Sequence, residues 1–446
     1  MSDASASAGS PGAAWLGAAA AKVAGALLSF LLLLALARTM SREAFAHVAV
    51  VLAWVAIATA GAGLNLPMTV LRFVTAGLAQ GRADLARGML RFATAVTLVC
   101  SLTLAATVAV IAGLDVVSLP RDLARSAVLG GALVVASVAL TMGAAFLQAL
   151  KRVVAAEIFT NVLRTSLMLG AIGAWSWWSG TSLSAPRVVA AYLATTMAAL
   201  AATIAYARLV SPQALRRASP RYMRREWSRA TIGYLGVMIA AAVSERVDML
   251  MIGWLGSTSD IAAYAVAARF AQTTTLTLTA VTAVAAPRLV EHLVEQRAAP
   301  AAAARQLIAG TARRMAAVAL LALAGFWLVS PWVLPLFGAH FDRSRTPLLI
   351  LAVGQVVAAM FGPATLVATL AGAARLAVLS LAGGIALNAA GCLLLVPRLG
   401  APGAALSTAF AMLATALTAW ALTRGRLGLD ASVLGDRWRT AARAAL

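Results

Sequence analysis

Charged residues and cysteines are scarce in this 446-residue chain. Only 11% of the residues are charged and 62% are hydrophobic, whereas a soluble domain has roughly 25% charged and roughly 45–50% apolar residues. This balance excludes a soluble enzyme and indicates an integral membrane protein. The two cysteines, Cys100 and Cys392, lie within apolar runs and lack a zinc-binding spacing. We therefore expect them to pack as small apolar residues and to form no disulfide framework.

Motifs of enzymatic chemistry are also missing. The sequence has no GxxxxGK[ST] loop for phosphates, no GxSxG nucleophile motif, no HExxH and no CxxC. Its three histidines, His47, His292 and His340, are scattered along the chain. We therefore expect no metal site, no catalytic residues and no enzymatic activity.

Long apolar stretches predict twelve transmembrane helices, because about 20 mostly apolar residues of helix cross a bilayer. We predict an all-α membrane protein with an N-terminal six-helix bundle (14–208), a basic cytoplasmic linker (209–229) and a C-terminal six-helix bundle (230–424). The predicted spans are 14–37, 44–66, 90–113, 124–147, 158–178, 188–207, 230–254, 261–286, 307–330, 347–371, 376–396 and 402–423.

The positions of the basic residues predict the orientation of the chain. With residues 1–13 placed in the cytoplasm, most of the 36 lysines and arginines fall on cytoplasmic loops or in a cytoplasmic tail, 425–446, as the positive-inside rule requires. The net charge of +21 then reflects orientation and attraction to anionic lipids, and no nucleic-acid partner is expected. The predicted external loops are short, the longest spanning 331–346, which leaves no room for an external catalytic domain.

A weak internal repeat relates the two predicted bundles. Residues 41–47 and 259–264 each follow one helix and open the next. Both of those next helices are expected to end at a proline, Pro67 or Pro287. Parallel repeats in transporters place a substrate path between two halves, which rock against each other to give alternating access.

Charged residues within the predicted spans mark the candidate sites. A charge at the centre of a span costs about 2.5–3.5 kcal/mol, so such residues usually face a bundle interior or a wet cavity. Snorkelling to the surface is the alternative for the residues near helix ends, and a structural ion-pair network is the alternative for the cluster at 245–248. The basic candidates are Lys22, Arg164, Arg246 and Arg269, of which Arg269 is the strongest, and the acidic ones are Glu245 and Asp248.

Basic residues within apolar walls suit an anionic amphiphile. Guanidinium groups form forked hydrogen bonds to phosphate oxygens, while the lipid tail of such a molecule remains in the bilayer. We therefore expect a negatively charged cargo.

Segments spread over nearly the whole chain also share a family pattern, at residues 36–45, 245–253, 261–269, 286–288, 336–341, 371–372 and 394–403. In order and spacing they resemble the polysaccharide-exporter flippases of the multidrug/oligosaccharidyl-lipid/polysaccharide (MOP) superfamily. The resemblance implies translocation of undecaprenyl-pyrophosphate-linked repeat units from the inner to the outer leaflet of the bacterial plasma membrane, for O-antigen, capsule or exopolysaccharide.

The resemblance also implies a site and partners. It implies two six-helix bundles around a central cationic cavity, in which Arg269 and Lys22, and less directly Arg246, bind the substrate. Arg164 is a further substrate-binding candidate because of its position within a predicted span. The implied partners are a lipid-linked anionic oligosaccharide, membrane lipids, a glycan polymerase and its chain-length machinery. No cofactor is implied apart from coupling sodium ions or protons.

Coupling rests on a comparison within the superfamily. In lipid II flippases a sodium site is formed by an acid of the seventh helix with an asparagine, a second acid and a threonine of the last two helices of the twelve. Asp248, Asn388 and Thr408 correspond to three of these residues, whereas Cys392 stands where the second acid is expected. Proton or potential coupling, in which Asp248 or Glu245 titrates, is the alternative.

Other functions are consistent with parts of the sequence. A drug or toxin extruder or a lipid II flippase of the same superfamily is the nearest alternative, but the first helix carries Lys22 where extruders tend to carry an acid. A membrane enzyme of glycan assembly is disfavoured by the short external loops. A scaffold that binds glycosyltransferases through residues 210–229 is a further possibility.

Overall fold

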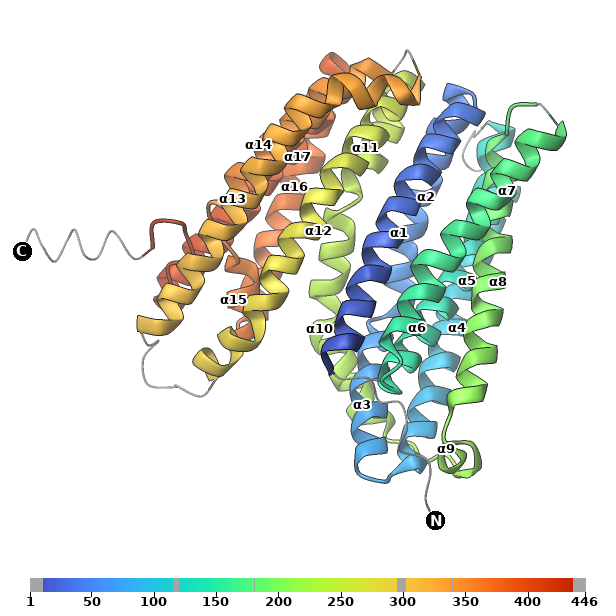
Figure 1. Cartoon of the computed structure of the whole chain (residues 1–446), viewed down its shortest axis with the longest axis vertical. Coiled ribbons are helices and arrows are strands. Elements are labelled where there is room, and N and C mark those ends of the chain that lie inside the picture. The colour runs from blue at the N-terminus through green and yellow to red at the C-terminus, as the bar shows by residue number, and fades with distance from the viewer. Residues whose placement is uncertain (1–10, 115–119, 180, 295–301, 339–340, 436–446) are drawn as a thin grey trace, which may run out of the picture. The chain divides into compact units, whose positions relative to one another are not determined.

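The computed structural model of the protein describes residues 11–114, 120–179, 181–294, 302–338 and 341–435, nearly all of them helical (Figure 1). The expectation of an all-α membrane protein is confirmed. His340 and the tail residues 1–10 and 436–446 lie outside the described residues. The chain divides into two compact units, an N-terminal unit of residues 1–235 and a C-terminal unit of residues 236–446.

The N-terminal unit contains ten helical segments and the start of another. They are α1 (Pro11–Thr39), α2 (Arg42–Gly63), α3 (Leu66–Ala79), α4 (Ala83–Gly113), α5 (Arg121–Ala149), α6 (Val153–Glu157), the π-helix η1 (Ile158–Leu163), α7 (Arg164–Ser179), α8 (Ala185–Val210), α9 (Gln213–Arg217) and the first part of α10 (Arg224–Ser244).

The C-terminal unit begins within α10 and is built in the same way from long helices with short interruptions. Its further elements are α11 (Val247–Leu255), α12 (Thr258–Val294), α13 (Ala302–Val333), the 3-10 helices η2 (Leu334–Phe337) and η3 (Phe341–Ser344), α14 (Arg345–Ala359), α15 (Ala364–Leu370), α16 (Ala374–Leu399) and α17 (Ala401–Leu427).

Many of these helices are long and apolar enough to cross a membrane. The described residues contain nine such helices, or ten if α14 and α15, which meet at 47°, count as one broken span. This number confirms a multi-pass membrane protein but does not confirm a total of twelve. The spans predicted at 230–254 and 261–286 are not among them, because the first is divided between α10 and α11 and the second contains a run of threonines.

Small residues allow the long helices to approach closely, as is usual for helices packed in membranes. In the N-terminal unit, α5 lies beside α2, α4 and α8, and a Cβ at Gly130 would come within 2.8 Å of the Trp54 ring of α2. In the C-terminal unit, a Cβ at Gly354 of α14 would lie 2.7 Å from Ala409 of α17. Alanine at either glycine would therefore push two helices apart.

The predicted second span ends earlier than expected, and a further helix follows it. Leu64 and Asn65 have positive φ angles of 48° and 59°, which stop α2 at Gly63. Pro67 lies in the first turn of α3, where its missing N–H costs nothing. Residues beyond 66 were predicted to form a loop, but Leu66 and its neighbours in α3 pack in a buried cluster that includes Trp227.

Two predicted spans are interrupted. The span at 230–254 breaks at Glu245 and Arg246, between α10 and α11. The span at 347–371 breaks between α14 and α15, where Gly362 has a φ of +63° and precedes Pro363. Apolar composition alone does not reveal such breaks, because the flanking residues remain hydrophobic.

The basic segment predicted as a linker folds onto the N-terminal unit. Arg87 of α4 donates hydrogen bonds to the backbone oxygens of Arg216 (2.5 Å) and Ala218 (2.6 Å). Trp227 is 1% exposed and packs with α3 and α4. Residues 209–229 therefore contain α9 and the start of α10 and are held by the first unit.

The segment after α17 also packs on its unit. Leu429 and Ala431 are buried in a cluster with Val367, and the N–H of Val433 donates to the Met360 oxygen at the end of α14 (2.9 Å). Up to residue 435, the predicted C-terminal tail is therefore part of the folded unit.

The internal repeat is visible in two helix caps. The Ser41 hydroxyl accepts from the N–H of Ala44 (3.2 Å), and the Ser257 hydroxyl accepts from the N–H of Asp260 (3.2 Å). The residue equivalent to Ser41 is therefore Ser257 and not Ser259. The prediction that the next helix ends at residue 287 is wrong, because α12 continues to Val294.

Candidate functional site

A buried carboxylate lies in the first turn of α11. Asp248 is 8% exposed, and its Oδ1 accepts from the backbone N–H of Met249 (2.7 Å). Arg246, with φ −137° and ψ −9°, separates α10 from α11. The break thus creates a new helix N-terminus, whose dipole favours the negative charge of Asp248.

Two hydroxyl groups close around this carboxylate. Tyr264 of α12 donates a hydrogen bond to Asp248 Oδ2, and Thr408 Oγ1 of α17 lies 3.4 Å from the same oxygen. The two hydroxyls are 3.1 Å apart. Tyr264 is fully buried and Thr408 is 5% exposed. The sequence pointed to Asp248 and Thr408 but missed Tyr264, whose only signal was a phenol within an apolar helix.

A second layer of polar side chains comes from α16. Asn388 donates from Nδ2 to Thr408 Oγ1 (3.4 Å), and Cys392 donates from Sγ to Asn388 Oδ1 (3.3 Å). Asn388 is 2% exposed and Cys392 is fully buried. The structure thus brings together all three residues that the sequence grouped as a coupling site, with Cys392 beside them. We call Asp248, Tyr264, Thr408, Asn388 and Cys392 the Asp248 cluster.

The Asp248 cluster contains a single carboxylate, and its polar atoms are hydrogen-bonded to one another. The described residues contain no group of three or more His, Cys, Asp or Glu side chains that could bind a metal ion. Asp248 Oδ2 already receives hydroxyl donors, and the oxygen of Asn388 is turned toward the Cys392 thiol. The side chains of the Asp248 cluster are thus hydrogen-bonded to one another around a single carboxylate.

Asp260 fixes two of the helices that build the cluster. Its Oδ2 accepts from the Ser257 hydroxyl (2.5 Å) at the start of α12, and its Oδ1 accepts from the N–H of Ala401 (3.2 Å) at the start of α17. Gly400, with a φ of +61°, lies against this carboxylate. Since Tyr264 is one turn further along α12, this double cap places its hydroxyl beside Thr408.

A separate charge pair lies in the N-terminal unit. Lys22 Nζ of α1 is 3.7 Å from Glu157 Oε1 at the end of α6, and the two side chains are 68% and 11% exposed. Asn161 of η1 donates from Nδ2 to Glu157 Oε2 (2.8 Å). Sequence reasoning missed Glu157 because the predicted span began at residue 158. We call Lys22, Glu157 and Asn161 the Lys22 cluster.

Arg164 begins α7, directly after the π-helix η1. Its side chain is half-buried and interacts electrostatically with Tyr192 of α8. A π-helix is rare and commonly marks a functional position. Here it separates Glu157, the last residue of α6, from Arg164, the first residue of α7, two charges of opposite sign within one candidate span.

The remaining predicted residues lie in the C-terminal unit. Glu245 is exposed at the helix break, and Arg246 beside it interacts electrostatically with Asp248. Arg269 of α12 is half-buried and donates from Nη1 to Gln272 Oε1 (2.6 Å). It lies five positions beyond Tyr264 on the same helix.

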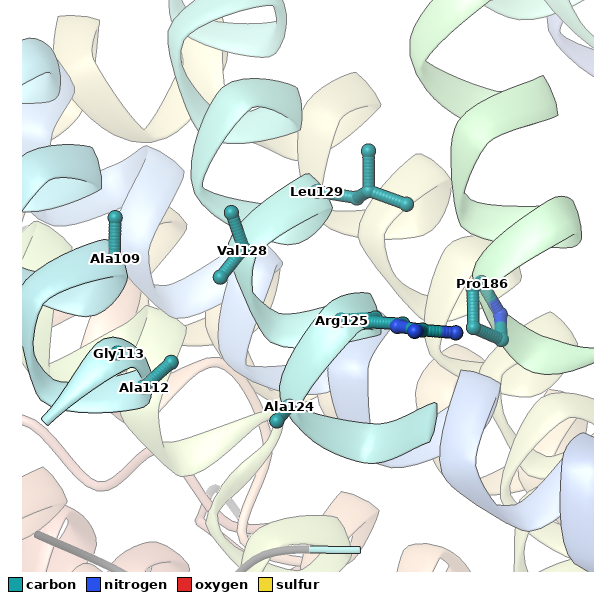
Figure 2. Close-up of a pocket in the computed structure, with 8 residues that line it drawn as sticks. All are labelled: Ala109, Ala112, Gly113, Ala124, Arg125, Val128, Leu129 and Pro186. Carbon is teal, nitrogen blue, oxygen red and sulfur yellow. The ribbon is translucent and has the colours of Figure 1, made fainter. Parts of the chain in front are cut away.

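Two apolar cavities of the N-terminal unit are separate from these clusters. One of about 480 Å³ lies between α4, α5 and α8, and the Arg125 side chain extends across it toward Pro186 (Figure 2). The other, of about 280 Å³, lies between α7 and α8 beside Arg187. Both are lined mainly by alanine and larger aliphatic residues, as lipid-facing surfaces are.

Solved structures of membrane transporters share this fold. An inward-facing multidrug resistance MATE family transporter of the MOP superfamily superposes with a TM-score of 0.74 at 14% identity, covering 90% of this chain and 94% of the transporter. The lipid II flippase MurJ in an inward closed conformation gives 0.71 at 10% identity, covering 91% and 87%. A MOP superfamily transporter from Pyrococcus furiosus gives 0.62 at 15% identity, covering 94% and 96%.

Sequence comparison identifies the family. No curated protein sequence matches the chain. Residues 12–292, which include the Lys22 cluster, Asp248 and Tyr264, match the family described as Polysaccharide biosynthesis protein. As the resemblance predicted, the chain therefore belongs to the polysaccharide biosynthesis protein family, on the fold of the MOP superfamily transporters.

Proposed function

We propose that this protein is a flippase that moves undecaprenyl-pyrophosphate-linked oligosaccharide repeat units from the inner to the outer leaflet of the plasma membrane. The observation that carries the proposal is the match of residues 12–292 to a polysaccharide biosynthesis family in a chain with a transporter fold. The repeat units moved to the outer leaflet would be used to build surface polysaccharides such as O-antigen, capsule or exopolysaccharide.

Intramembrane cations support an anionic cargo. The Lys22 side chain is 68% exposed although it lies in a helix long and apolar enough to span the membrane. Arg269 and Arg246 supply guanidinium groups in the C-terminal unit, and Arg164 supplies one in the N-terminal unit. In the proposed mechanism, these residues bind the pyrophosphate, and alternating access exposes it to either side of the membrane.

Coupling belongs to the Asp248 cluster in this proposal. A buried carboxylate that receives two hydroxyl donors is well placed to take up and release a proton. Tyr264 and Thr408 hold the ionised form by hydrogen bonds, and Arg246 adds an opposite charge nearby. Protonation of Asp248 would weaken these interactions between α11, α12 and α17. We therefore favour proton coupling at Asp248 over sodium coupling.

The setting of the protein follows from its orientation. In this proposal both termini are cytoplasmic, and the basic segment 209–229 faces the inner leaflet, where the lipid-linked units would be made. A polymerase and its chain-length machinery would take up the flipped units on the other side. These enzymes would be separate proteins, because the predicted external loops of this chain are too short to contain a catalytic domain.

A drug or toxin extruder is the second candidate, favoured by the TM-score of 0.74 to a multidrug transporter structure. That structure shares 14% of its sequence with this chain, which supports a common fold only. The exposed cation Lys22 suits an anionic cargo better than the cationic drugs such an extruder would carry.

Deletion of the gene tests the proposal. We expect complete lipid-linked repeat units to accumulate on the cytoplasmic leaflet and surface polymer to disappear. If the units reach the outer face and stay unpolymerised, the protein is an enzyme of polymer assembly instead. If the glycan is unchanged and drug sensitivity rises, it is an extruder.

A further inference from the structure

In the Lys22 cluster, Glu157 makes a long contact with Lys22 and a short hydrogen bond with Asn161. The 3.7 Å between Lys22 Nζ and Glu157 Oε1 exceeds the about 2.7–2.9 Å of a charge-assisted hydrogen bond. The Glu157 carboxylate is instead held by the Asn161 amide at 2.8 Å. Glu157 can therefore lose its contact with Lys22 without being left unsatisfied, whereas Lys22 retains donors for another anion.

The pair lies close to one membrane surface. Glu157 is four residues from Val153, where its candidate span begins, which corresponds to about 6 Å along a helix. Lys151 and Arg152 immediately precede that span, and the positive-inside rule assigns such basic turns to the cytoplasm. The lipid-linked substrate would be loaded from this side.

Small residues lie on the same face of α1 as Lys22. Positions three and four residues away on a helix share its face, and in α1 these are alanines and a glycine: Ala18, Ala19, Gly25 and Ala26. At Gly25 the helix touches η1 closely, because a Cβ there would come within 2.8 Å of Asn161 Cβ. This close packing fixes the position of Asn161, while the Lys22 side chain remains 68% exposed.

We propose that Glu157 is the resident counter-ion of Lys22 and that a phosphate group of the lipid-linked substrate displaces it. Glu157 stabilises Lys22 while no substrate is bound, since an uncompensated charge within the membrane is costly. When the phosphate binds Lys22, Asn161 retains the freed carboxylate. The return of Glu157 to Lys22 then assists release. This inference rests on the proposed function, in which Lys22 binds the cargo.

Binding of undecaprenyl phosphate to the purified full-length protein in nanodiscs tests this exchange. We expect Glu157→Gln to raise the affinity about 1.5- to 5-fold, the range set by an exposed ion pair, because Gln still accepts from Asn161 but no longer competes for Lys22. Asn161→Ala should lower the affinity, since the carboxylate then pairs more closely with Lys22. General damage to the site would lower the affinity in both variants.

Matched controls and a double variant sharpen the test. The exposed residues Glu226 and Lys151 provide Glu226→Gln and Lys151→Asn, which remove the same charges elsewhere and should leave binding unchanged. In a Lys22→Ala background, Glu157→Gln should have no effect. If Glu157→Gln does not fold, Asn161→Ala still tests the idea, because its effect should vanish when Lys22 is also replaced.

The outcomes separate the exchange from the proposed function. If Lys22→Ala binds the probe as well as the wild type does, Lys22 does not bind cargo, and the exchange fails while the flippase function is still tested separately by the gene deletion. If Lys22→Ala weakens binding but Glu157→Gln does not strengthen it, only the exchange is overturned. Inorganic pyrophosphate should show the same dependence on Glu157. A dependence seen only with the lipid would contradict displacement by phosphate.

Discussion

The two units hold intramembrane charge in opposite ways. In the N-terminal unit the cation Lys22 is 68% exposed and only loosely paired with its acid. In the C-terminal unit the acid Asp248 is 8% exposed and enclosed by hydroxyl groups from other helices. An exposed cation can exchange its partner for a bulky anion from outside, whereas an enclosed carboxylate exchanges only something as small as a proton. In the proposed mechanism, the Lys22 cluster therefore binds cargo and the Asp248 cluster serves coupling.

The largest expected effect is the loss of cargo binding. Lys22→Ala should abolish restoration of surface polysaccharide in a deletion strain at normal membrane abundance, because no other lysine lies in a predicted span. Lys151→Asn, at a position with a φ of +61° that asparagine tolerates, serves as the matched control. Full restoration by Lys22→Ala would show that the exposed cation of the N-terminal unit does not bind cargo, which contradicts the proposed difference between the two units.

A similarly large effect is expected at Arg269. Arg269→Ala should abolish restoration, and Arg269→Lys should retain part of it because lysine keeps the charge but loses the forked donor geometry. The measurement is surface polymer per molecule of protein in the membrane. Equal activity of the alanine variant and the wild type would remove Arg269 from the binding site.

The next effect concerns coupling. Asp248→Asn keeps the shape of the side chain and can still accept from Tyr264, so the protein should fold. Transport should fall about 5- to 150-fold, the range of typical coupling energies, and should lose its dependence on a proton gradient. Tyr264→Phe should give a smaller loss. If Asp248→Asn transports normally and still responds to the gradient, the Asp248 cluster is structural.

A moderate effect on stability is expected at Asp260, which caps two of the helices that form the Asp248 cluster. Asp260→Asn weakens the caps of α12 and α17 and should lower stability by about 1.5–3 kcal/mol, as hydrogen bonds to a charged group do. Gly400→Ala should act in the same direction, because its Cβ would collide with the Asp260 carboxylate. Thermal unfolding in detergent, with Asp342→Asn as an exposed control, measures both. Unchanged unfolding temperatures would show that the double cap does not hold these helices.

The smallest effect concerns the segment after α17. Burial alone would raise the pKa of Asp430, but hydrogen bonds from Trp420 and Ser432, with the charge of Arg424, hold its pKa below the ordinary value. A lowered pKa stabilises the fold above the unfolded value of about 3.9, and this stability is lost as the pH falls through the folded pKa. At pH 7, Asp430→Asn should therefore lower the free energy of unfolding by about 1 kcal/mol. This loss is measured as a lower unfolding temperature than that of the wild type. The difference should shrink below about pH 4. A constant difference down to pH 3 would contradict this explanation.

Hydropathy predicted where most long helices lie, because the bilayer requires about 20 apolar residues whatever their order. It did not predict the breaks at 64–65, 245–246 and 360–363, which depend on backbone conformation at one or two residues. The separate helix α3 was missed for the same reason, since it begins at residue 66 within a stretch that remained apolar.

The candidate site was predicted in part. Asp248, Asn388 and Thr408 were grouped from the resemblance, and the structure places them in one cluster. Tyr264 was missed because its contact with Thr408 joins residues 144 positions apart, which no periodicity reveals. Glu157 was missed because a shift of one helix boundary moved it from a span to a loop.

Transfer between leaflets in reconstituted vesicles tests the central claim most directly. The purified protein would be placed in vesicles that carry an undecaprenyl-pyrophosphate-linked oligosaccharide in one leaflet, and the sugar reaching the other leaflet would be measured. We predict that the wild type transfers the lipid, that Lys22→Ala does not bind or transfer it, and that Asp248→Asn binds it but loses its response to a proton gradient. Absence of transfer by the wild type would contradict the proposed function, and equal transfer by Lys22→Ala would contradict the role of Lys22 in cargo binding.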